Sequence, residues 1–367
     1  MKKKIKLGDL CKPARGQIKE SPNTIIDYID ISSVDSNSKT ITGYQTMPFS
    51  EAPSRARKPV EIHSVIVSTV RPNLNAVAVF EQETLNIPVV STGFCVLDCK
   101  EDVDYRFIFN YCRSHAFIDS MTSQATGASY PAVTDKIIRS ALVPDYSYKE
   151  QREISYILDS VANIIELRKK EITALDNLIK ARFVEMFGNP ITNSKGLETK
   201  DLKNVVMLKA GDFTAASDIA DRPTETNKYP CYGGNGIRGY VAEYNQEGDY
   251  SLVGRQGALS GNVQYATGRF KNTEHALLVT PVIEMNSIWL NQLLINLDLK
   301  RYQTGAAQPG LSVKNLQEIQ IITVSIDEQK AFADFVQQVD KLLRRQSKLA
   351  EKKAAVAITP GANFDFS

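Results

Sequence analysis

Histidine and tryptophan are scarce in this chain, which has three histidines and one tryptophan among 367 residues. His63, His115 and His275 stand in unrelated contexts, so a histidine-based metal or catalytic site is not expected. The five cysteines are odd in number and scattered, which indicates reduced thiols in a cytoplasmic protein. Cys95 and Cys99 have no second Cys or His pair nearby, so a zinc site is not expected either.

Long apolar runs and charge of one sign are also missing. No segment is apolar over the length that spans a bilayer. The basic start Met1–Lys6 is not followed by the apolar region of a signal peptide, so we expect no membrane partner. The formal net charge is only +2. Such a balance neither requires nor excludes nucleic acid, because binding depends on where the charges lie.

Enzyme motifs are lacking as well, with one apparent exception. The chain has no P-loop, but Gly234-Asn-Gly-Ile-Arg-Gly239 matches the dinucleotide pattern G-x-G-x-x-G. That motif needs a helix after it, whereas Tyr-Val-Ala-Glu-Tyr follows here and is typical of a strand. We therefore interpret the stretch as a glycine turn between strands, and a nucleotide-dependent enzyme remains the weaker alternative.

The strongest positive feature is an internal duplication. Gly127-Ala-Ser-Tyr-Pro-Ala-Val-Thr-Asp-Lys136 is matched, 178 positions later, by Gly305-Ala-Ala-Gln-Pro-Gly-Leu-Ser-Val-Lys314. The same offset carries Glu150-Gln151 onto Glu328-Gln329. A period this long is a duplicated domain and not a solenoid repeat. The Gly…Pro…Lys element is either a phosphate-contacting loop, through Lys136 and Lys314, or the joint between each domain and the helix after it, and we favour the joint.

A long helix is expected after each Glu-Gln pair, because apolar residues recur there with a period of 3.5. A heptad seam of this kind predicts two helices that pack on each other as a coiled coil. The first helix is expected to end at Phe187-Gly188-Asn-Pro190, where glycine and proline stop it. The residues expected to make the packing are Ile154, Leu158, Val161, Ile165, Phe332, Val336, Val339 and Leu343. In the first seam, Ile172, Leu175, Ile179 and Met186 continue the pattern.

The remaining segments alternate short apolar runs with turns, which predicts a mixed α/β (α+β) fold with strand-rich domains. The expected boundaries are residues 1–148 for the first domain, 149–187 for the first helix, 188–200 for a linker, 201–325 for the second domain, 326–356 for the second helix and 357–367 for a tail.

Loops that carry Arg, Lys, Asn and Gln are the candidate DNA contacts, because Arg and Lys neutralise phosphate and Arg, Asn and Gln pair with base edges. Arg71 and Arg255 each follow a strand directly, which favours these two. The candidates in the first domain are Arg55, Arg57, Lys58, Arg71, Asn73 and Asn75. Those in the second domain are Arg238, Arg255, Gln256, Arg269 and Lys271.

Two domains, each followed by a similar joint and a long helix, resemble the specificity subunit of a Type I restriction–modification enzyme. Ser64–Asn75 with Ser91–Cys95 is similar to one kind of target-recognition domain. Tyr229–Tyr240, Val253–Gly261 and Asn272–His275 are similar to another. Gln124–Gly127 and Gln303–Gly305 add to the resemblance, which extends to about residue 355.

The resemblance implies a non-catalytic, cytoplasmic subunit that reads double-stranded DNA for host defence. Each domain would read one half of a split, asymmetric target, and an antiparallel coiled coil with pseudo-twofold symmetry would set the gap. Two modification subunits would bring S-adenosylmethionine, and restriction subunits would bring ATP and Mg²⁺, so the chain itself would bind no cofactor and no metal. The specificity subunit of another restriction–methylation type and a coiled-coil adaptor that binds protein remain alternatives.

Overall fold

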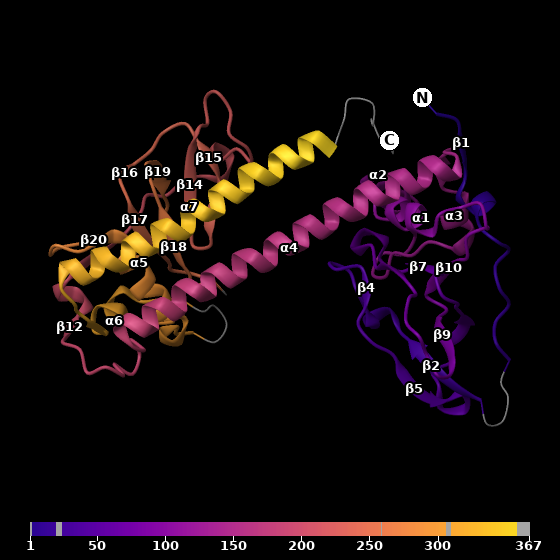
Figure 1. Ribbon diagram of the computed structural model, residues 1–367, viewed down its shortest axis with the longest axis horizontal. Helices are drawn as coiled ribbons and strands as arrows, with labels where there is room; N and C mark the ends of the chain where they lie inside the picture. Colours follow the sequence, from indigo (N-terminus) through magenta and orange to yellow (C-terminus); the bar gives the residue numbers. More distant parts are fainter. Residues whose placement is uncertain (1, 20–23, 258, 306–309, 358–367) are drawn as a thin grey trace. The chain divides into compact units, whose positions relative to one another are not determined.

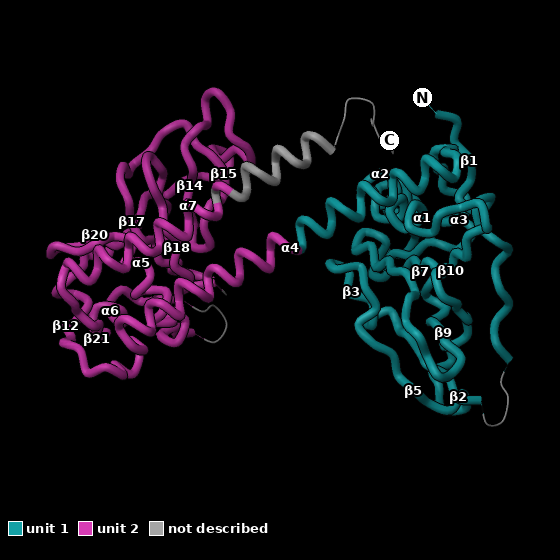
Figure 2. Tube along the Cα trace, in the orientation of Figure 1, with its two compact units in different colours: residues 1–166, 353–367 teal, residues 167–352 magenta. Residues whose placement is uncertain are grey.

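The computed structural model describes residues 2–19, 24–257, 259–305 and 310–357 (Figure 1). The chain divides into two compact units, residues 1–166 with 353–367 and residues 167–352 (Figure 2). The boundary falls inside the long helix α4 (Tyr148–Phe187), which begins in unit 1 and ends in unit 2. Both units combine short strands with helices, so the mixed α/β class expected from the sequence is confirmed.

Unit 1 holds four small sheets, with strand orders β5-β2-β9-β6, β10-β7-β8, β1-β11 and β3-β4. Neighbouring strands are antiparallel except for the central pair β2 and β9. The strands are β1 Lys4–Lys6, β2 Ile25–Ile29, β3 Val34–Asp35, β4 Thr40–Ile41, β5 Gln45–Pro48, β6 Ala56–Pro59, β7 Val65–Ser68, β8 Val77–Val79, β9 Ile87–Ser91, β10 Phe94–Leu97 and β11 Leu142–Pro144. The helices are η1 Leu7–Leu10, η2 Ile31–Ser33, η3 Phe49–Glu51, η4 Pro72–Leu74, α1 Tyr105–Cys112, α2 His115–Gln124 and α3 Asp135–Ser140.

Unit 2 holds three sheets, with strand orders β13-β20-β17-β18, β15-β14-β19-β16 and β12-β21. The strands are β12 Thr199–Asp201, β13 Val206–Ala210, β14 Tyr229–Gly233, β15 Gly236–Val241, β16 Gln246–Glu247, β17 Tyr250–Gly254, β18 Val263–Ala266, β19 Arg269–Asn272, β20 Ala276–Pro281 and β21 Gln320–Ile322. The helices are η5 Leu202–Asn204, η6 Ala216–Asp218, α5 Ser287–Asn296, η7 Leu299–Tyr302, α6 Val313–Gln317 and α7 Ile326–Ala357.

The duplication seen in the sequence is present as a shared backbone frame. β10-β7-β8 in unit 1 corresponds to β20-β17-β18 in unit 2, and β1-β11 corresponds to β12-β21. Thr126 and Ala132 exchange both backbone hydrogen bonds, and so do Thr304 and Gly310, 178 positions later. The repeated element therefore closes the same turn in both units.

The Glu-Gln pair explains why both long helices begin where they do. Ser147 and Glu150 form a reciprocal capping box at the start of α4, with the Ser147 N–H donating to Glu150 Oε2 at 2.8 Å. Ser325 and Glu328 repeat this at the start of α7 at 3.1 Å. These two caps place the helix starts within one residue of the starts expected from the sequence.

The buried glutamines of the two pairs act as clips. Gln151 Oε1 accepts from the N–H of Asp104, the N-cap residue of α1, at 3.0 Å, while its Nε2 donates to the Tyr146 carbonyl at 2.8 Å. In unit 2 the Gln329 amide does the same, accepting from the Asn286 N–H at 2.9 Å and donating to the Val324 carbonyl at 3.0 Å. Each clip ties the start of a long helix to a short helix of its own unit.

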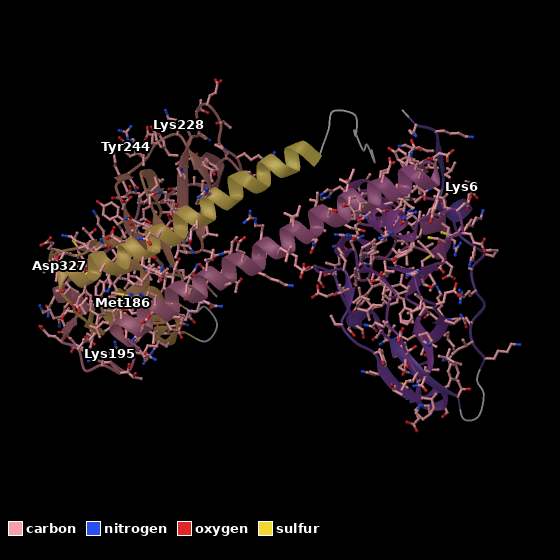
Figure 3. The ribbon with its side chains drawn as sticks, viewed as in Figure 1. Lys6, Met186, Lys195, Lys228, Tyr244 and Asp327 are labelled. Carbon is pink, nitrogen blue, oxygen red and sulfur yellow. The ribbon has the colours of Figure 1, made fainter. Side chains whose placement is uncertain are left out.

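The end of α4 also follows the sequence expectation. The Gly188 N–H donates to the Val184 carbonyl at 2.8 Å, and Gly188 has φ 75°, which suits glycine at this position. The Lys195 ammonium folds back onto the last turn and donates to the Met186 carbonyl at 3.1 Å (Figure 3). A cation at this end stabilises the free carbonyls of the helix.

Candidate nucleic-acid interface

In unit 1 the loop after β7 is held out by the repeated element. The Arg71 N–H donates to the Pro131 carbonyl at 2.7 Å, and Arg71 has φ 49° at the start of η4. Its guanidinium lies over the exposed Tyr130 ring, 5.1 Å from the centroid. Asn73, inside η4, is exposed. Arg71, Asn73 and Tyr130 therefore form a polar and aromatic tip that is open to solvent.

Asn75 differs from its two neighbours, and its assignment as a DNA contact is corrected. Its side chain is 6% exposed. Its Nδ2 donates to the Cys112 carbonyl at 2.8 Å, and its Oδ1 accepts from Lys39 Nζ at 2.9 Å. Because both ends of the amide are engaged inside the unit, Asn75 anchors the loop to α1 and does not face a base edge.

The expected basic cluster of Arg55, Arg57 and Lys58 lies at the start of β6 and along it, but its members have different partners. Lys58 Nζ donates to the Phe94 carbonyl at 2.6 Å and pairs with Asp135 at 2.7 Å. These contacts join β6 to β10 and α3. Lys58 thus has partners inside unit 1, and its contact with DNA stays a prediction.

Arg55 and Arg57 are engaged more loosely. Arg55 Nη2 pairs with Asp30 at 2.6 Å, and the Tyr28 hydroxyl, followed by the Asp30 charge, raises the pKa of Arg55 above its ordinary value. The Arg57 guanidinium lies over the Phe49 ring at 4.7 Å and donates to the Ala56 carbonyl at 2.9 Å. Arg55 is the more exposed member of this pair and keeps a side available to phosphate.

In unit 2 the glycine motif is a hairpin and not a nucleotide loop. β14 ends at Gly233, and β15 starts at Gly236 and pairs back onto β14. The strand in place of a helix removes the dinucleotide interpretation. Arg238 lies exposed on β15 with its stem against Gly233.

Arg255 and Gln256 lie at the rim of a surface pocket of about 580 Å³. The pocket is lined by Arg255, Gln256, Gly257, Thr304, Gly310, Leu311 and Ser312. The Arg255 guanidinium makes no hydrogen bond or ion pair with any residue that the structure describes. The repeated element thus forms one wall of the candidate reading site of unit 2.

Arg269 and Lys271, on β19, both have acidic neighbours. Arg269 Nε pairs with Glu247 at 3.1 Å, and its guanidinium lies 5.1 Å from the Tyr244 ring centroid. Lys271 Nζ lies 3.6 Å from Asp212, whose pKa is held below its ordinary value by the Asn245 amide and then by the Lys271 charge. Arg269 stays half exposed, whereas Lys271 is largely covered.

Arg71 and Arg255 were expected to occupy parallel positions in the two units, but the backbone hydrogen bonds show that they do not. The Thr69 carbonyl accepts from the Val133 N–H, and the Arg255 carbonyl accepts from the Leu311 N–H, both at 2.8 Å. Since Leu311 lies 178 positions after Val133, Arg255 matches Thr69. The counterpart of Arg71 is then Gly257, two residues further along the chain.

The backbone pairing of the repeated element lies within its own domain, against the loops that carry candidate DNA contacts. The role favoured from the sequence, a joint between each domain and the long helix after it, stays a prediction. Besides closing its own turn, the repeated element pairs with the loop after β7 at Val70 and Ala132, and with the loop after β17 at Gln256 and Gly310. Lys136 and Lys314 lie exposed on α3 and α6. Pro309, the counterpart of Pro131 in the duplication, lies outside the described residues, as does the tail from residue 358.

The seam residues of α4 have three different environments. Ile154 is buried in the core of unit 1, and Leu158 packs against that core. Val161, Ile165 and Ile172 are 38%, 51% and 49% exposed. Leu175, Ile179 and Met186 pack in the core of unit 2. At both ends of α4, the residues of the heptad pattern therefore pack against the core of a globular unit, and those in the middle remain exposed.

The matching residues of α7 lie in the core of unit 2. Phe332 meets Phe183 and Phe187 of α4 edge-on, at centroid distances of 5.4 and 5.7 Å. Val336 and Val339 are buried in the same cluster, and Leu343 is half-buried. The last turns of α4 and the first turns of α7 thus pack on each other within unit 2.

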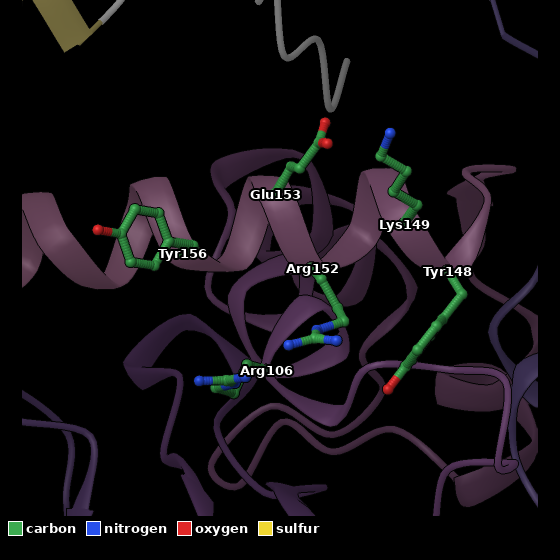
Figure 4. A pocket seen from close by; sticks show the side chains of 6 residues that line it. All are labelled: Arg106, Tyr148, Lys149, Arg152, Glu153 and Tyr156. Carbon is green, nitrogen blue, oxygen red and sulfur yellow. The ribbon is translucent and has the colours of Figure 1, made fainter.

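A second surface lies at the start of α4 and is wholly part of unit 1 (Figure 4). It is a pocket of about 530 Å³ lined by Arg106, Tyr148, Lys149, Arg152, Glu153 and Tyr156. Tyr156 is 74% exposed, and the Arg152 guanidinium lies 5.9 Å from the Tyr148 ring centroid. The equivalent positions of α7 carry Ile326, Asp327, Lys330 and Asp334, so this basic and aromatic surface is not duplicated.

Sequence analysis missed two residues beside the candidate site, Glu274 and His275. Both lie in the family-like stretch Asn272–His275, and no functional role was assigned to either from the sequence, because nothing in it places them next to Gln256. In the described ranges, no group of three His, Cys, Asp or Glu side chains is arranged to hold a metal ion. None of the helices in those ranges is both long and apolar enough to cross a bilayer.

Comparison with known proteins agrees with this architecture. The family model of the Type I restriction modification DNA specificity domain matches residues 2–177 and 194–352. The Type I restriction enzyme EcoprrI specificity subunit of Escherichia coli is 30% identical over 319 residues, which cover 80% of this chain and 75% of that protein.

Two solved structures share the fold. The S subunit of a Type-I restriction-modification system from M. genitalium has a TM-score of 0.60 at 16% identity, covering 97% of this chain and 93% of that one. A chain from work on complex assembly and conformational transition of the type I R-M system has a TM-score of 0.54 at 23% identity, covering 97% and 94%. The chain therefore belongs to the family of Type I restriction–modification specificity subunits, which recognise DNA.

Proposed function

We propose that the two units read the two halves of a split, asymmetric DNA target. The supporting observation is that they share one backbone frame but carry different side chains on the loops that this frame holds out. Unit 1 has Arg71 and Asn73 on its loop, whereas unit 2 has Arg255 and Gln256 on the matching wall. Side chains that contact base edges determine which sequence is read. Two similar domains with different side chains on these loops are therefore suited to two different half-sites.

The two long helices would set the distance between the half-sites. α4 has 40 residues, which corresponds to about 60 Å of helix at roughly 1.5 Å per residue. The edge-on packing of Phe183 on Phe332 supports an α4–α7 pair. We propose that this pair continues as an antiparallel coiled coil with pseudo-twofold symmetry, so that helix length fixes the spacer of the target.

The middle of α4 is the proposed docking surface for the modification subunits. Here large apolar side chains that lie off the heptad seam are exposed, which supports an interface with another protein. They are Ile164, Leu167 and Leu178. The pocket at the start of α4 adds tyrosine and arginine, residue types that interfaces favour.

In this proposal the chain recognises the target sequence, and its partner subunits carry out the catalysis. Two modification subunits carry S-adenosylmethionine and methylate adenines flipped out of the duplex. Restriction subunits carry ATP and Mg²⁺ for translocation and cleavage. The chain itself works as a non-catalytic subunit, in the cytoplasm where the host DNA lies.

The test is a base-modification map of host DNA with and without this gene. Loss of one gapped adenine-methylation motif upon deletion would support the proposal and reveal both half-sites together. An unchanged map, together with no salt-sensitive DNA binding by the reconstituted complex, would overturn it and favour a protein-binding adaptor.

Two variants separate the half-sites. Arg71→Ala is expected to relax one half-site and leave the other intact, and Arg255→Ala is expected to do the converse, so each variant is the control for the other. If both variants weaken binding equally over all sequences, the two arginines contact phosphate and not bases.

A further inference from the structure

One position of the shared frame carries a chain of polar side chains in unit 2 and none in unit 1. The Thr69 N–H donates to the Gly93 carbonyl at 2.8 Å, and the Arg255 N–H donates to the His275 carbonyl at 2.9 Å. His275 therefore occupies the place of Gly93. By the same match, Gln256 takes the place of Val70.

The polar chain in unit 2 runs from Glu274 through His275 to Gln256. His275 Nε2 lies 3.1 Å from Glu274 Oε1, and His275 Nδ1 lies 3.0 Å from Gln256 Oε1. The His275 side chain is 40% exposed and that of Glu274 is 28% exposed, while Gln256 is exposed at the pocket rim. The chain thus leads from the interior of unit 2 to the surface beside Arg255.

These contacts leave one end of the Gln256 amide facing outward. Glu274 at one ring nitrogen fixes the orientation of the His275 ring, and the other ring nitrogen holds one end of the Gln256 amide. Gln256 therefore presents the opposite end of its amide to the outside.

The orientation has a consequence for base reading. A glutamine amide has a donor end and an acceptor end of nearly the same shape, so a freely rotating Gln256 would accept either kind of partner. Held by His275, it offers one end only, so it discriminates between major-groove acceptors, such as guanine O6 and N7 or thymine O4, and the amino groups of adenine and cytosine.

We propose that His275, held by Glu274, is a positioning residue that fixes the Gln256 amide, so that unit 2 discriminates between a base with a major-groove acceptor and a base with a major-groove donor. The inference rests on the proposed function and deepens it. Unit 1 has Val70 and Gly93 at the matching places, so the device acts on one half-site only. Arg255, next to Gln256, lies close enough in sequence to read or clamp the same step.

His275 also contacts Glu274, so its removal affects the packing of unit 2 as well. Glu274 Oε2 is enclosed and makes no hydrogen bond within the described part of the chain. Without His275 the other carboxylate oxygen would lose its partner too, which is unfavourable in a partly buried site. The experiment must therefore distinguish a change of base preference from a loss of folding.

The test uses cells that carry the complete system and compares the methylated motif of wild type, His275→Phe, Gln256→Ala and the double variant. We expect His275→Phe to leave the half-site of unit 1 unchanged. At one position in the half-site of unit 2, it should lower discrimination between bases about 5- to 100-fold. Gln256→Ala should act at the same position, and the double variant should add nothing, since both remove one interaction.

Controls keep the outcome readable. Glu274→Gln preserves an acceptor for His275 and is expected to retain most of the discrimination. Thermal unfolding of each purified chain shows whether unit 2 still folds. A purely structural His275 would lower stability and methylation of the whole motif without relaxing any base, and that result would overturn the inference. So would additive effects of the two substitutions at separate positions.

The two proposals fail in different ways. If no gapped motif depends on this gene, the proposed function fails. If the motif depends on the gene but keeps its bases in His275→Phe and Gln256→Ala, the proposed function stands and only the role of His275 is refuted.

Discussion

Because the two buried glutamines each bond two backbone groups, we expect that removing one of their side-chain amides strongly lowers the stability of its unit. Gln329 is 4% exposed, and its side chain satisfies the Asn286 N–H and the Val324 carbonyl. Gln329→Ala would leave both backbone groups without their partner. Each partly buried group left in this way costs about 1–3 kcal/mol, so we expect a loss of about 2–6 kcal/mol in the stability of unit 2. For a unit of this size, that corresponds to a fall in Tm of about 4–24 °C.

Calorimetry of the full chain measures the transition, and hydrogen exchange at the Asn286 amide reports the contact itself. Gln329→Met keeps the volume but not the hydrogen bonds, and it is expected to be nearly as destabilising as alanine. Gln337→Ala, on the exposed face of α7, should change stability by less than about 0.5 kcal/mol. Full stability of Gln329→Met, or unchanged exchange at Asn286, would refute the reasoning.

The matching clip in unit 1 provides an internal replicate. Gln151 is 2% exposed and bonds the Asp104 N–H and the Tyr146 carbonyl. Gln151→Ala should speed exchange at Asp104 and leave Asn286 protected, because the two clips lie in different units. Loss of protection at both sites from either substitution would contradict the assignment of each clip to one unit.

Three further predictions follow from the packing and the caps. Phe332→Ala removes the ring that meets Phe183, and we expect it to destabilise unit 2 by about 3–5 kcal/mol in denaturant unfolding, whereas a loss under about 1 kcal/mol would contradict a shared α4–α7 core. The bonds from Lys2 and then from Ser147 lower the pKa of Glu150 to about 2, so its stabilisation of the α4 start is present above its ordinary value of 4.5 and is lost as the pH falls toward 2; acid titration followed by NMR should show this, and Glu150→Gln should abolish the titration. Burial raises the pKa of Cys95 to about 12, so the native thiol should resist alkylation at pH 8 and react only after unfolding, and rapid labelling of the folded chain would disprove its burial.

The positions of some candidate residues along the fold could be predicted from the sequence, because strand ends depend on local chemistry. Arg71, Asn73, Arg255 and Gln256 were expected after strands; in the structure Arg71 and Asn73 lie at and in η4 after β7, and Arg255 and Gln256 lie on the loop after β17. The ion pair of Lys58 could not be predicted, because the charge of a residue says nothing about a distant acidic partner. Only the fold brings Asp135 to Lys58.

What the sequence determined by itself is the two long helices, with their starts and the end of α4, and the existence of the duplication. Ser147-x-x-Glu150 and Ser325-x-x-Glu328 specify helix starts through contacts within one turn, and Gly188 ends α4 in the same local way. Such contacts involve residues close in the chain, so they can be read along it.

Only the tertiary structure decided which residues of the two units are equivalent. The offset is 178 at Val133 and Leu311, but Arg255 lies 186 positions after its counterpart Thr69. Loops of different length separate the matched strands, and only backbone hydrogen bonds between distant strands restore the register. The same non-local pairing places His275 beside Gln256, because Gln256 follows β17 and His275 precedes β20, and these two strands are neighbours in the sheet but not in the chain.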